Sequence, residues 1–103
     1  MTQILRAHHA QLTYPSGPDS EAQAREFYSG CLGMRELPKP EVLRGRGGFW
    51  LELEGFQIHL SPEDGVDRSK TRAHVAYLVD DLSAWRERLE ARGIVTKPGG
   101  ELP

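Results

Sequence analysis

The chain has 103 residues, so it can hold one domain or a pair of small modules but not two independent hydrophobic cores. Its 38% hydrophobic and 27% charged residues are ordinary for a soluble protein, and its net charge of -2 lacks the basic excess that favours nucleic acid as a partner. The single cysteine, Cys31, excludes an internal disulfide. The opening residues read as neither signal peptide nor membrane span, so we expect a cytoplasmic protein that binds no membrane.

The stretch from Ile4 to Tyr14 predicts the first strand. Apolar side chains alternate there with polar ones, the apolar set being Ala10, Leu12 and Tyr14. His9 and Gln11 therefore share the polar face. His8 falls on the opposite face and is expected to be structural.

A helix is predicted to follow the turn PSGPDS. Ser20 with Gln23 forms a candidate capping box at its start. One apolar stripe then recurs at three- and four-residue spacing and comprises Ala24, Phe27, Tyr28, Cys31 and Leu32. Gly33 can adopt the left-handed conformation that ends a helix, and Met34 to Leu37 is predicted to resume as a strand.

The stretch GFWLELEGFQIHL predicts a hairpin whose loop is Glu54-Gly55. That loop fixes a register in which Leu53 faces Phe56, Glu52 faces Gln57, Leu51 faces Ile58 and Trp50 faces His59. The polar side of the hairpin thus carries Trp50, Glu52, Gln57 and His59. Its apolar side is expected to cover the stripe of the helix.

The second half of the chain repeats the first. After a polar connector, residues 73–79 alternate as a strand that carries His74, and Asp81 is a candidate cap for the next helix. Gly93 ends that helix, and residues 94–96 begin another strand. His59 lies 26 positions after Gly33, so its counterpart in the repeat would lie beyond Pro103. We therefore expect the chain to be part of a longer one.

The segments HHAQLTYP, REFYSGCLGM, FWLELEGFQIHL and AHVAYLVDDLSAWRERLEARG resemble the vicinal oxygen chelate superfamily. That superfamily groups glyoxalase I, fosfomycin-resistance enzymes, bleomycin-binding proteins and extradiol dioxygenases. The resemblance implies an α+β fold of paired βαβββ modules that form a cup-shaped mixed sheet with helices outside. Residues 1–62 would be the first module, 63–72 the connector and 73–103 an incomplete second module. Relatives also imply a homodimer.

The resemblance implies a divalent metal ion, with His9, His59 and His74 at three of the four ligand positions. The fourth is normally a glutamate in a segment that nothing here matches, and Glu101 does not take that role. Imidazoles with a carboxylate hold zinc, iron, manganese or nickel while leaving positions for a chelating substrate. The residues do not select among these metals.

Other residues of the polar faces complete the candidate site. Glu52 is the candidate general base, and Gln11 and Trp50 are candidate ligand contacts. A solvated Glu52 and a packing role for Trp50 are the structural alternatives. Two functions follow: a metal-dependent enzyme acting on a small oxygen-rich substrate, or a metal-free module that binds a small drug-like molecule in the same cup. A role mainly as an assembly partner is a weaker third reading.

Overall fold

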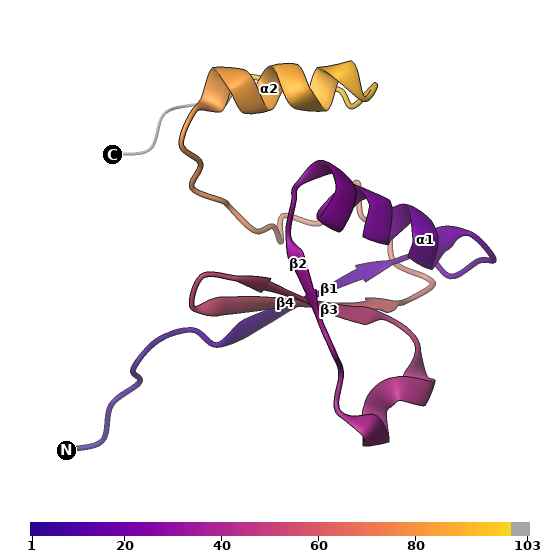
Figure 1. Cartoon of the computed structure of the whole chain (residues 1–103), viewed down its shortest axis with the longest axis vertical. Helices are drawn as coiled ribbons and strands as arrows, with labels where there is room; N and C mark the ends of the chain where they lie inside the picture. The colour runs from indigo at the N-terminus through magenta and orange to yellow at the C-terminus, as the bar shows by residue number, and fades with distance from the viewer. Residues whose placement is uncertain (100–103) are drawn as a thin grey trace. The chain divides into compact units, whose positions relative to one another are not determined.

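The computed structural model describes residues 1–99 and divides the chain into two compact units, Met1–Arg68 and Ser69–Pro103 (Figure 1). The predicted connector, residues 63–72, spans the boundary between these units. Residues 100–103, which close the expected second module, lie outside the described residues. The two units are taken in turn.

The first unit contains one mixed sheet with helical segments between its strands. In chain order its elements are β1 (His9–Tyr14), α1 (Ser20–Arg25), η1 (Glu26–Cys31), β2 (Arg35–Leu37), η2 (Glu41–Arg46), β3 (Phe49–Leu53) and β4 (Phe56–Pro62). The strand order is β1-β4-β3-β2, in which β1 runs parallel to β4 and the other neighbours are antiparallel. This order is that of a βαβββ module, so the predicted α+β fold class is confirmed.

The hydrophobic core lies on the face of the sheet that α1 and η1 cover (Figure 1). Leu51 and Ile58 are fully buried there, as partners across β3 and β4. Cys31 of η1 is buried with them, and the guanidinium of Arg25 lies 4.6 Å from the centre of the Phe49 ring. The apolar side of the hairpin therefore meets the helical segment, as its alternation predicted.

The helical segment starts and continues differently from the prediction. Asp19 is the N-cap and makes no side-chain capping bond, so the predicted capping box of Ser20 and Gln23 is wrong. The α-helix then widens into the π-helix η1, over which the apolar stripe continues to buried Cys31. Gly33, with a φ of 75°, ends the segment as expected.

The second unit contains α2 (Leu82–Ala91). Asp81 caps it by accepting a hydrogen bond from the Ala84 amide at 3.1 Å, and Gly93 follows it with a φ of 78°, as the sequence predicted. The strands predicted over 73–79 and 94–96 are wrong, because the described part of this unit forms no strand with which they could pair. Within residues 1–99, no helix has the length and apolar character to cross a membrane.

Candidate functional site

Polar residues of three strands lie on the face of the sheet opposite α1 and η1. The register pairs Trp50 with His59 and Glu52 with Gln57 across the hairpin, which confirms the predicted alignment. On the other side of β4, His9 lies beside Gln57 and Gln11 beside His59. Neighbouring residues in register point to the same face, so β1, β4 and β3 present one continuous polar surface.

Three aromatic rings form a stack across this surface. The Trp50 and His59 rings are 3.9 Å apart and 3° from parallel. On its other side His59 stacks on His9, at 4.2 Å and 13°. Trp50 is the direct cross-strand neighbour of His59, whereas His9 lies diagonally from it, a separation that rings can still bridge. The stack leaves His59 only 7% exposed.

Burial lowers the pKa of His59 below its ordinary value of 6.5, and the nearby His9 and His8 lower it further by repulsion. The imidazole is therefore neutral at pH 7. Its Nε2 lies 2.8 Å from the Gln57 side-chain oxygen, which can only accept, so in this arrangement Nε2 carries the proton. The unprotonated nitrogen, which carries the lone pair that a metal ligand needs, is then Nδ1.

One ring nitrogen of His9 also makes a hydrogen-bond contact. Its Nδ1 lies 3.0 Å from Nδ1 of His8, and the two rings meet edge to face. One of these nitrogens must donate to the other. The contact leaves Nε2 of His9 outside the pair.

The sequence analysis did not predict two of these contacts, that of His8 with His9 and that of Gln57 with His59. His8 was expected to be structural because it falls on the opposite side of a strand starting at Ile4. The strand instead begins at His9, so strand alternation does not govern His8. Gln57 was placed on the polar face without a role. The two-residue spacing from His59 was the available signal for this contact.

The other predicted residues make contacts of their own. Glu52 accepts a hydrogen bond from Arg35 at 2.7 Å through Oε1, in an exposed ion pair. The Gln11 amide donates to the Leu12 carbonyl and, at 2.9 Å, to the Ser61 hydroxyl. Gln11 is thus directed along the strands, and its amide bonds do not involve the ring stack.

His74 belongs to the second unit, where it is exposed with its Nδ1 2.7 Å from the Arg72 carbonyl oxygen. Among residues 1–99, no three His, Cys, Asp or Glu side chains are grouped so as to hold a metal ion. The first unit alone brings together two of the three predicted ligands, His9 and His59.

Comparison with known proteins assigns the family. A family model described as the Glyoxalase/Bleomycin resistance protein/Dioxygenase superfamily matches residues 7–101. Among solved structures, a Bacillus anthracis protein described as a glyoxalase family protein is 35% identical to this chain, with a TM-score of 0.78, and the match covers 90% of this chain and 74% of that one. No curated protein gave a match.

Two more distant structures share the fold. One is a protein from the mobile metagenome of V. pseudocholerae, at 24% identity and a TM-score of 0.65, covering 96% of this chain and 75% of that one. The other is an integron cassette protein from V. cholerae, at 20% identity and a TM-score of 0.65, covering 96% and 76%. Together with the βαβββ module, the family match establishes that this chain belongs to the glyoxalase, bleomycin resistance protein and dioxygenase superfamily.

Proposed function

We propose that this chain is a metal-dependent enzyme of the glyoxalase and dioxygenase type, acting on a small substrate that chelates through two oxygens. The observation that carries the proposal is the pair of neighbouring imidazoles, His9 and His59, which adjacent strands present on one face 4.2 Å apart. The glyoxalase family description of the Bacillus anthracis protein supports the same class.

The first unit would supply two imidazole donors to a divalent metal. His59 is neutral and holds one ring nitrogen against the Gln57 oxygen, the arrangement by which proteins orient metal-binding histidines. His9 would be the second ligand, and the resemblance to the family alone proposes His74 as the third. Zinc, iron, manganese or nickel bound there would supply Lewis acidity toward a carbonyl or enolate oxygen.

The remaining polar residues have proposed roles around that centre. Trp50 covers one face of His59 and would exclude water from it while offering an aromatic edge to the substrate. Gln11 would donate to the substrate after exchanging its bond with Ser61. Glu52 would accept a substrate proton through the oxygen that Arg35 does not hold.

Elemental analysis tests this proposal. The full-length protein, purified without a metal-affinity tag, is expected to contain near-stoichiometric metal. A variant with His9→Ala, His59→Ala and His74→Ala should lose it, whereas Gln11→Ala, a control on the same face whose amide bonds do not involve the ring stack, should keep it. Equal metal content in the wild-type protein and the triple variant would refute the proposal.

The ring stack favours a second candidate, a metal-free module that binds a small aromatic or drug-like molecule. Three rings in contact, from Trp50 to His9, form a platform on which a flat ligand can stack. After chelator treatment, such a module would still bind a flat aromatic probe, and Trp50→Ala would abolish that binding. A metal enzyme would instead lose affinity for a chelating probe on the same treatment.

We also propose that the protein associates as a homodimer, as its resemblance to the superfamily implies. Sedimentation of the full-length protein would give the mass of two chains, and a monomer at micromolar concentration would contradict this.

A further inference from the structure

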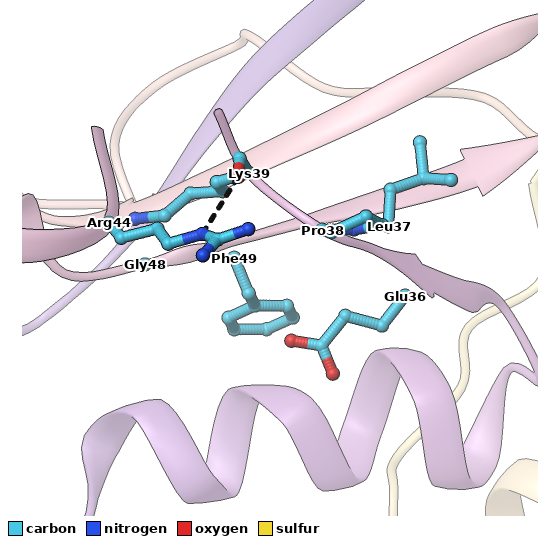
Figure 2. Close-up of a pocket in the computed structure, with 7 residues that line it drawn as sticks. All are labelled: Glu36, Leu37, Pro38, Lys39, Arg44, Gly48 and Phe49. Carbon is cyan, nitrogen blue, oxygen red and sulfur yellow. Dashed lines mark hydrogen bonds between the residues drawn. The ribbon is translucent and has the colours of Figure 1, made fainter. Parts of the chain in front are cut away.

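An open surface cavity of about 340 Å³ lies at the β2 edge of the sheet, between that strand, the segment 38–48 and the start of β3 (Figure 2). Two of its lining residues identify the face of the sheet. Glu36 pairs in register with buried Leu51, and Phe49 pairs with buried Leu60. These positions belong to the core side, whereas Leu37, also in the lining, pairs in register with Trp50. None of the three stacked residues, His9, Trp50 and His59, lines the cavity.

The segment 38–48 contributes two cationic residues, Lys39 and Arg44, to the lining of this cavity. The Lys39 ammonium donates to the Gly47 carbonyl at 2.9 Å, and Nε of Arg44 donates to the Lys39 carbonyl at 3.2 Å, the bond drawn in Figure 2. Both bonds use backbone acceptors, which carry no formal charge. Within residues 1–99, neither Lys39 nor Arg44 forms an ion pair with a carboxylate.

Glu36, the acidic residue in the lining, is not a counter-ion for Lys39 or Arg44, because it forms an ion pair with Arg25. Nε of Arg25 lies 3.2 Å from both carboxylate oxygens of Glu36, and its Nη2 lies 3.0 Å from one of them. Figure 2 shows the Glu36 carboxylate directed toward the helix, with the Phe49 ring between it and the Arg44 guanidinium in that view. Within residues 1–99, no carboxylate therefore pairs with the charge of Lys39 or Arg44.

We propose that this cavity binds a small organic carboxylate. A guanidinium matches the two oxygens of a carboxylate, and a neighbouring ammonium adds a further donor. Pro38 and Phe49 give the same cavity an apolar lining, which favours a ligand with a hydrocarbon body over an inorganic anion. This site is independent of the proposed metal centre and does not require it.

Amide NMR spectra of the full chain test the proposal, with benzoate as the probe and inorganic phosphate as the comparison. Benzoate is expected to shift the Gly47 and Gly48 amides saturably in the millimolar range and to bind more tightly than phosphate. Arg44→Gln and Lys39→Gln should each weaken benzoate binding by about threefold to tenfold, because both cations lie near solvent.

Arg46→Gln is the matched control, since it removes the same charge from η2 without lining the cavity. It should leave benzoate binding unchanged. Equal weakening by Arg46→Gln, phosphate binding as tight as benzoate, or shifts that do not saturate would overturn the proposal. Spectra of the unliganded variants that match the wild-type spectrum away from the substituted residue would show that each has folded.

Discussion

The carboxylate of Glu21 connects α1 to β1 and to the residue that precedes β3. It accepts hydrogen bonds from the Gly48 amide at 2.8 Å, the Tyr14 hydroxyl at 3.2 Å and Arg25 at 3.4 Å. The Gly48 bond is the largest cause of a pKa below the ordinary 4.5, with Tyr14 and Arg25 adding to it and burial opposing it. Glu21→Gln would remove the charge that strengthens these bonds.

The expected loss at pH 7 is about 1 kcal/mol of unfolding free energy. Hydrogen bonds to a charged group contribute roughly 1.5–3 kcal/mol when buried, and we take less because the Glu21 side chain is 43% exposed. Since the folded pKa is the lower one, this stabilisation is complete above pH 4.5 and is lost as the pH falls through the folded value. The variant and the wild-type protein should therefore converge in acid.

Urea denaturation at pH 7 and at about pH 3 measures this difference. Glu41→Gln is the matched control, because it removes an exposed glutamate of η2. The control should match the wild-type protein at both pH values. A Glu21→Gln loss that is equal at both pH values, or no larger than that of the control, would refute this account of Glu21.

Two further perturbations test the packing. Ile58→Ala should cost about 2–5 kcal/mol in urea denaturation because Ile58 is fully buried in the core, and a cost below about 1 kcal/mol would contradict that placement. Gly48→Ala should greatly reduce the Tm, because a Cβ there would lie 2.1 Å from the Leu60 carbonyl oxygen. Gly47→Ala, at a similar positive φ but with its nearest neighbour 3.8 Å away, should cost about 1–2 kcal/mol, so equal losses at the two glycines would exclude the clash as the cause.

The hairpin and both ends of α2 were predictable because local rules determine them, whereas the start of α1 was not. A two-residue loop at Glu54-Gly55 leaves one register, and that register sets the face of Trp50 and His59. Asp81 and Gly93 lie where short-range capping chemistry requires them. These features depend on residues a few positions apart.

Features that depend on distant partners were not predictable in the same way. The first strand begins at His9 rather than Ile4, because its ladder with β4 starts at the pair of His9 and Gln57. Residues 73–79 have strand alternation but no strand to pair with in the described part of their unit. The closeness of His9 to His59 also depends on the parallel pairing of strands far apart in the sequence. Alternation alone placed each histidine on a face without giving the distance between them.

The zinc affinity of the full-length, metal-free protein and its single variants tests the central claim most directly. His9→Ala, His59→Ala and His74→Ala should each raise the zinc Kd more than Gln57→Ala, for which loss of the hydrogen bond to His59 predicts about 10–100-fold. Gln11→Ala, whose amide bonds do not involve the ring stack, should leave the Kd near the wild-type value. Zinc binding that none of the three ligand substitutions weakens, or no zinc binding by the wild-type protein, would contradict the proposed metal site.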